Sequence, residues 1–122
     1  MCWLNLTLIC CYLLFWHEGQ LRAELGATEA ALSLFERAKL PPEEDDHIRI
    51  PWNIYVEATM AFVQRNRPAL SAARKRSANV PQSFFAGKKG PPNLDVVDGL
   101  LECFEREYAE AYSKGKTIRS RK

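Results

Sequence analysis

The sequence predicts an all-α domain of about five helices, arranged as antiparallel pairs. Small and bulky residues recur between residues 15 and 38 at the spacing of two short helices joined by a glycine turn: Phe15, Gly19, Gly26, Ala31, Phe35 and Ala38. Prolines that stop or start helices divide the rest of the chain. The 122 residues are enough to bury one core and too few for two, so we expect a single domain over residues 1–112.

Two helices are predicted in the first part of the chain. The first covers residues 1–26 and ends at Gly26, because glycine adopts a positive φ without strain and so suits a tight turn. The second covers residues 27–40, with Thr28 as its cap, and ends before two consecutive prolines. An acidic run over residues 43–46 is then predicted as a solvated loop.

The remaining helices follow similar signals. A helix over residues 51–66 starts at Pro51, and another over 68–79 starts at Pro68. The segment 80–93 is rich in proline and glycine and is predicted as a loop. One helix is predicted over 94–112, because apolar residues repeat there at steps of three and four: Leu94, Val97, Leu101, Phe104, Tyr108 and Ala111. The basic tail 113–122 is predicted to be disordered.

Composition and charge are those of a folded globular protein, with 47% hydrophobic and 26% charged residues. The net charge of +2 combines −4 in residues 1–50 (four basic, eight acidic) with +6 in residues 51–122 (thirteen basic, seven acidic). The basic residues form separate clusters without the interleaved aromatic residues that stack on bases. Nucleic-acid binding is therefore not expected.

The start of the chain allows more than one interpretation, because residues 2–16 contain no charged residue. A signal peptide is disfavoured, since no Lys or Arg precedes Arg22 and no small-residue cleavage site follows the run. The run is also shorter than the ~20 residues of a spanning helix. We favour a buried helix in which Cys10 and Cys11 are small buried side chains, and keep a membrane anchor through residues 2–16 as the alternative.

No pattern assembles a catalytic, cofactor or metal site. The four cysteines form no Cys-x-x-Cys pair, and only His17 and His47 are available to complete a zinc site. Residues 114–117 resemble the end of a phosphate-binding loop, but Glu110 stands where that loop requires glycine. We therefore expect a protein that is not an enzyme and that holds no cofactor or metal.

The first helix pair resembles a tetratricopeptide repeat, a unit of about 34 residues with fixed small and bulky positions. The residues that carry the resemblance are Phe15, Gly19, Gly26, Ala31, Phe35 and Ala38. Arg22 departs from it, since an aromatic residue is usual there. The second pair, over residues 52–81, is a weaker copy that keeps Ala69, Ala73 and Pro81 but has Glu57 in place of glycine.

The resemblance implies a non-catalytic protein-binding scaffold, such as an adaptor, a regulator or an immunity-type protein. We expect it in the cytoplasm. The first helix of each pair would line a concave groove, and the candidate partner-binding residues are Glu18, Arg22, Asn53, Glu57 and Gln64. Because three or more repeats normally share a core, about two repeats imply self-association, docking on a protein partner, or a shortened form of a longer protein. The alternative function is a small membrane-associated accessory protein, anchored by the first helix with its basic tail near anionic lipid.

Overall fold

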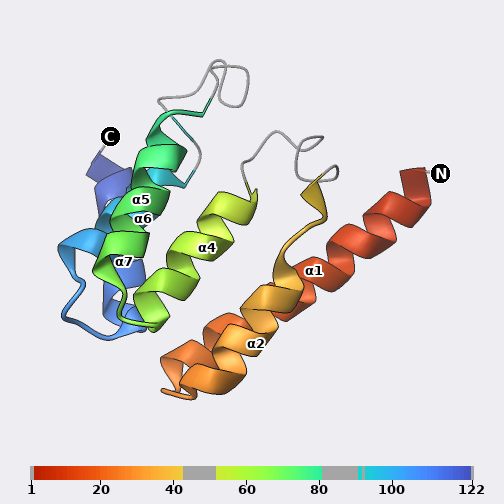
Figure 1. Ribbon diagram of the computed structural model, residues 1–122, viewed down its shortest axis with the longest axis horizontal. Helices are drawn as coiled ribbons and strands as arrows, with labels where there is room; N and C mark the ends of the chain where they lie inside the picture. Colours follow the sequence, from red (N-terminus) through yellow and green to blue (C-terminus); the bar gives the residue numbers. More distant parts are fainter. Residues whose placement is uncertain (1, 43–51, 81–90, 92, 122) are drawn as a thin grey trace.

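The computed structural model describes residues 2–42, 52–80, 91 and 93–121 (Figure 1). These residues form six helices and no strand: α1 (Cys2–Glu24), α2 (Thr28–Ala38), α4 (Trp52–Val63), α5 (Arg67–Ala78), α6 (Leu94–Glu102) and α7 (Tyr108–Arg121). They pack as antiparallel pairs, α1 with α2, α4 with α5 and α6 with α7. The predicted all-α fold and its helix pairs are confirmed. The acidic run at 43–46 and most of the predicted loop at 80–93 lie outside the described residues.

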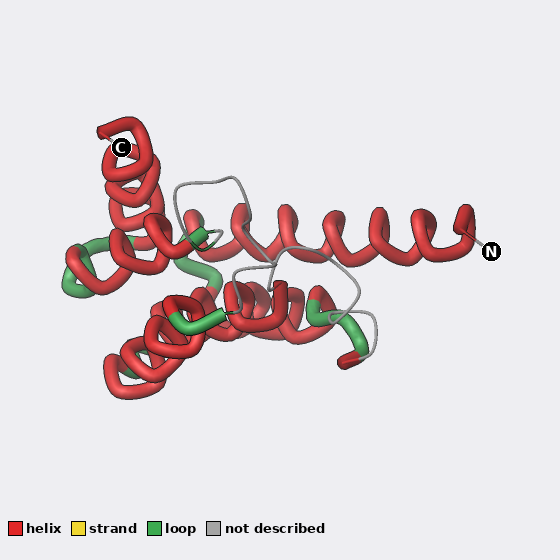
Figure 2. Tube along the Cα trace, turned by 90° about the horizontal axis from the view of Figure 1, so that it is seen from above, coloured by secondary structure: helices red, strands yellow, loops and turns green. Residues whose placement is uncertain are grey.

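The pairs follow one another, and the last helix then returns to the first. Helix α2 packs on α4, α5 packs on α6, and α7 reaches back to contact α1. Helix α1 has 23 residues and α2 has 11, so the N-terminal half of α1 projects past the end of its partner, as Figure 2 shows. The contact between α7 and α1 brings the last helix of the domain against the first.

Tight packing between α1 and α2 depends on one glycine. Phe35 on α2 is fully buried and lies against Trp16, with ring centroids 5.0 Å apart. A Cβ atom added at Gly19 would lie 2.7 Å from Cε1 of Phe35, closer than real Cβ contacts allow. The aromatic cluster continues to Tyr55 on α4, whose ring centroid lies 4.9 Å from that of Trp16. Gly19 therefore makes room for the Phe35 ring, and Trp16 joins this first pair to the second.

The single helix predicted over 94–112 is wrong, because α6 ends at Glu102 and α7 begins at Tyr108. Phe104 in the intervening turn packs edge-on against Phe62, with centroids 5.8 Å apart. Arg65 holds the same turn, as its Nη1 donates hydrogen bonds to the carbonyl oxygens of Phe104 at 2.7 Å and Arg106 at 2.9 Å. Two carbonyl oxygens of this chain reversal thus have a hydrogen-bond donor.

The predicted disorder of residues 113–122 is also wrong as far as Arg121, since α7 continues to that residue. Close approach to α6 explains this. A Cβ atom at Gly115 would lie 2.6 Å from the Cα of Val96, and one at Gly99 would lie 2.7 Å from the Cα of Gly115. The two glycines let the helix backbones touch. Residues 114–117 resemble the end of a phosphate-binding loop, but Gly115 there has a packing role.

Candidate protein-binding surface

Two of the five predicted partner-binding residues make contacts inside the fold. The Asn53 amide accepts a hydrogen bond from the backbone N–H of Leu40 at 2.8 Å and donates one to its carbonyl oxygen at 2.7 Å. The Glu57 carboxylate lies 2.8 Å from Arg76 and 3.9 Å from Lys39. Because these contacts join α4 to α5 and to the chain after α2, both side chains have a structural explanation.

The other three predicted residues lie elsewhere on the surface. Glu18 and Arg22 are exposed on α1 and form an ion pair 3.6 Å long, and Gln64 is exposed after the end of α4. The five thus lie on α1, on α4 and directly after α4. The repeat register places residues on the first helix of each pair, but it does not show which neighbouring helix each one faces. Their part in binding stays a prediction.

A different surface stands out on α1. We define the outer face of α1 as Leu14, Leu21 and Leu25, which are 68%, 61% and 79% exposed. Helical spacing puts these leucines opposite the side that buries Trp16 and Gly19. Scattered exposed leucines are ordinary, but a contiguous apolar patch of a few hundred Å² marks an interaction site.

Two cysteines of α1 are exposed, as the leucines of the outer face are. Cys10 and Cys11 are exposed, so the prediction that they are buried is wrong. Helix α1 has 23 residues and α2 has 11, so the residues of α1 farthest from the turn extend past the end of α2. An apolar run favours burial, but a side chain in it is buried only if another element packs against it.

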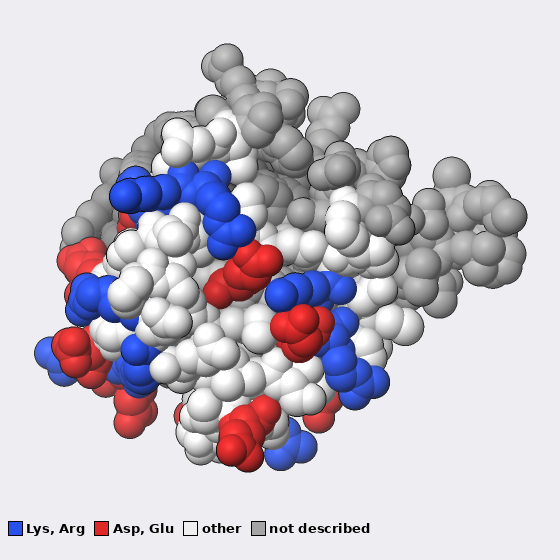
Figure 3. Space-filling model, viewed as in Figure 1, with Lys and Arg blue, Asp and Glu red and all other residues white. Residues whose placement is uncertain are grey.

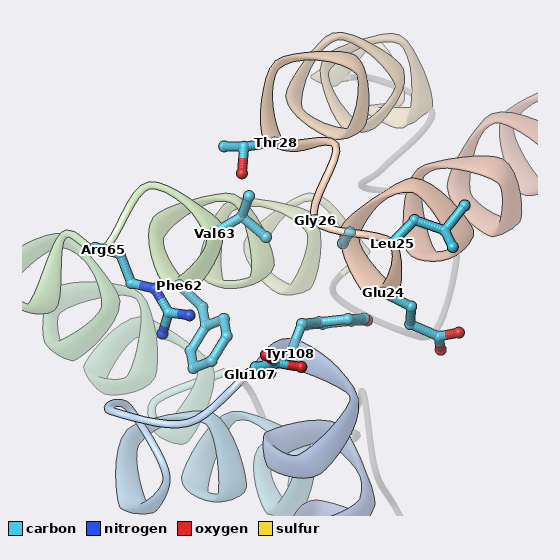
Figure 4. Close-up of a pocket in the computed structure, with 10 residues that line it drawn as sticks. Glu24, Leu25, Gly26, Thr28, Phe62, Val63, Arg65, Glu107 and Tyr108 are labelled. Atoms are coloured by element: carbon cyan, nitrogen blue, oxygen red, sulfur yellow. The ribbon is translucent and has the colours of Figure 1, made fainter.

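A hollow of about 340 Å³ opens where the outer face ends (Figure 4). Its walls come from the turn after α1, the start of α2, the end of α4 and the start of α7. The lining residues are Ala23, Glu24, Leu25, Gly26, Thr28, Phe62, Val63, Arg65, Glu107 and Tyr108. Leu25 belongs both to the hollow and to the outer face of α1, so the two features form one continuous surface.

Tyr108 fixes the position of α7 beside α1 at this hollow. Its hydroxyl group accepts a hydrogen bond from Nε2 of Gln20 at 3.0 Å, and the side chain is buried. Burial raises the pKa of the Tyr108 phenol well above its ordinary value near 10, the Gln20 hydrogen bond lowers it, and the charges of Tyr112 and Glu24 raise it. The folded protein therefore favours the neutral phenol.

Alkaline pH tests this placement. Above pH 10 an unfolded chain releases the Tyr108 proton while the folded chain keeps it, so stability is full below pH 10 and falls as the pH rises. The loss attributable to Tyr108 is roughly 1.4 kcal/mol for each pH unit above 10. Urea unfolding at pH 8, 10 and 11 should show a steeper loss in the wild type than in Tyr108→Phe. Tyr12→Phe, the control on α1, should follow the wild type; parallel curves for wild type and Tyr108→Phe would place that phenol in water.

The charged surface does not offer a continuous basic patch among the described residues. Seven basic side chains there have a carboxylate within 4 Å: Arg22, Lys39, Arg67, Arg74, Arg76, Arg106 and Lys114. The hydrogen bond to Asp98, 2.8 Å long, raises the pKa of Arg74. Figure 3 shows both signs of charge intermixed over the face it presents. This pattern is typical of a solvated surface rather than of a phosphate-binding one.

No helix in the described ranges combines the length and the apolar character that crossing a membrane requires. No group of three His, Cys, Asp or Glu residues gathers there in a metal-binding arrangement. Comparison with known proteins identifies no relative, since no protein-family model, no curated protein and no solved structure matches the chain.

Proposed function

We propose that the protein is a non-catalytic interaction module that binds a protein partner through the outer face of α1. The observation that carries the proposal is the exposure of Leu14, Leu21 and Leu25 on one side of a helix whose other side is packed. Burying a leucine side chain stabilises a complex by ~1.5–3 kcal/mol, so three together can form the apolar centre of an interface.

The surroundings of the leucines support a protein partner. Protein interfaces combine an apolar centre with a polar, solvent-accessible rim. In the exposed ion pair on α1, Arg22 lies to one side of the leucines and supplies part of such a rim. Glu18 is four residues after Leu14 and three before Leu21, so it lies between them. Both predicted partner-binding residues on α1 would thus contact the partner together with the leucines.

The tetratricopeptide-like character of the first pair supports the same class of function. The contact between Gly19 and Phe35 is a small residue against a bulky one, at positions that the resemblance assigns to such residues. Proteins of this kind present helix surfaces to other proteins and carry no chemistry of their own. We place the protein in this class, as a small adaptor, regulator or immunity-type protein.

The test uses a partner captured by the full-length protein, then purified and titrated against designed variants. Leu14→Gln/Leu21→Gln keeps helix propensity and side-chain length while removing apolar area, so it should weaken the partner's affinity at least tenfold. The control, Ser33→Gln/Ala72→Gln, alters exposed positions on α2 and α5 and should bind like the wild type.

Three results would overturn the proposal. Equal weakening by the two double variants would mean that the outer face has no special role. Sedimentation with vesicles of phosphatidylserine and phosphatidylcholine that requires Leu14 and Leu21 would favour the membrane-associated alternative instead. Light scattering that shows only self-association, abolished by the leucine substitutions, would make the partner a second copy of the chain rather than a different protein.

A further inference from the structure

We infer that the hollow beside α1 accepts a basic side chain, lysine or arginine, from the protein partner. The inference rests on the proposed function, because the hollow and the outer face share Leu25 and would meet the same partner. It goes further by assigning the chemistry of the group that enters.

The size and floor of the hollow suit one long side chain. A volume of about 340 Å³ lies at the lower end of the ~300–1,000 Å³ range of small-molecule sites. Phe62, Val63 and Leu25 supply apolar walls, and a Cβ atom at Gly26 would meet no atom within 4 Å. Lysine and arginine place their methylene stems along such walls while the charged head stays at the wet mouth.

The charge of the lining selects a cation. Glu24 and Glu107 contribute two carboxylates, and neither lies within 4 Å of a basic nitrogen of the described residues. The acidic side chains that do have such a partner are Glu18, Glu36, Glu57, Asp98, Glu102, Glu105 and Glu110. Two carboxylates without an ion-pair partner beside apolar walls attract an incoming cation and repel an incoming carboxylate.

Arg65 is the basic residue of the lining, and it is already engaged. Its Nη1 donates to the carbonyl oxygens of Phe104 and Arg106, and its guanidinium lies 4.7 Å from the centroid of the Phe62 ring. These contacts hold the backbone at Arg106, the residue before Glu107, and so fix the place of Glu107 at the hollow. Figure 4 shows Glu107 beside Phe62 and Tyr108, and Glu24 at the outer edge. Arg65 thus positions one carboxylate of the site and keeps its positive charge, so the two carboxylates and one guanidinium give the lining a net charge of −1.

The probe is the blocked peptide acetyl-Gly-Gly-Lys-Gly-Gly-amide, titrated into the ¹⁵N-labelled full chain and followed by NMR. We expect saturable shifts of the amides of Gly26, Val63 and Glu107, with a dissociation constant in the millimolar range that is typical of a single side chain. The same peptide with an Nε-acetylated lysine should bind at least fivefold more weakly. An arginine version shows which basic head fits better.

Variants assign the binding to the hollow. Glu24→Gln/Glu107→Gln should weaken the lysine peptide at least fivefold, whereas Glu29→Gln, at an exposed position on α2 that does not line the hollow, should leave it unchanged. Equal binding of the acetylated peptide, or equal binding by the double variant, would overturn the inference. Leu14→Gln/Leu21→Gln should still bind the peptide, so loss of the partner with the peptide retained would separate the two proposals.

Discussion

Gly115→Ala and Gly99→Ala are each expected to lower the free energy of unfolding by about 1–2 kcal/mol. The new methyl group at either position meets backbone of the facing helix, which cannot move aside as a flexible side chain would. Overpacking costs about 1–3 kcal/mol. The better helix propensity of alanine offsets about 1 kcal/mol of this cost. Urea unfolding followed by circular dichroism measures the change.

A control on the same helix makes the result specific. Glu110→Ala is an exposed substitution in the first turns of α7 and should stay within about 0.5 kcal/mol of the wild type. If the glycine variants were as stable as this control, α6 and α7 could not cross in backbone contact. The return of α7 toward α1 would then need another explanation.

Phe35→Ala is expected to cost about 3–5 kcal/mol, the range for removing a fully buried phenylalanine. The ring fills the space that Gly19 leaves open and contacts Trp16, so its loss leaves a cavity in the aromatic cluster. Because the wild-type stability of a domain is about 5–15 kcal/mol, this single change removes a large part of it. Tryptophan fluorescence during urea unfolding reports directly on the affected cluster.

Phe35→Leu separates loss of volume from loss of the aromatic ring and should cost clearly less than the alanine variant. A cost below about 1 kcal/mol for Phe35→Ala would contradict the packing of α1 on α2. The outer face of α1 would then no longer be defined, since the side of the helix opposite α2 would be unknown.

Local sequence signals were sufficient for the helix pairs. Gly26 marks the turn after α1 and has a φ of 79°. The cap predicted at Thr28 is wrong, because Thr28 is the first residue of α2 and Ala27 precedes it without a side-chain cap. The break between α6 and α7 could not be predicted in the same way. Val97 and Ala111 both face the core, so the apolar repeat continues across the chain reversal and imitates one helix.

The candidate site was missed for a related reason. The leucines of α1 belong to a segment whose apolar residues predict burial, and the sequence does not say which side of a helix a neighbour covers. Leu14 and Leu21 are seven residues apart, which was the available signal that they share a side. The hollow had no local signal, because it forms only when α7 returns to α1 and brings Glu107 near Leu25.

The most direct test of the central proposal is site-specific photo-crosslinking in cells that produce the full-length protein. A benzoylphenylalanine placed at Leu21, on the outer face of α1, should yield one dominant adduct with a different protein. The same group at Glu36, an exposed position on α2, should not yield that adduct. Equal adducts from both positions, or adducts from Leu21 that contain only lipid, would contradict a protein-binding surface on α1.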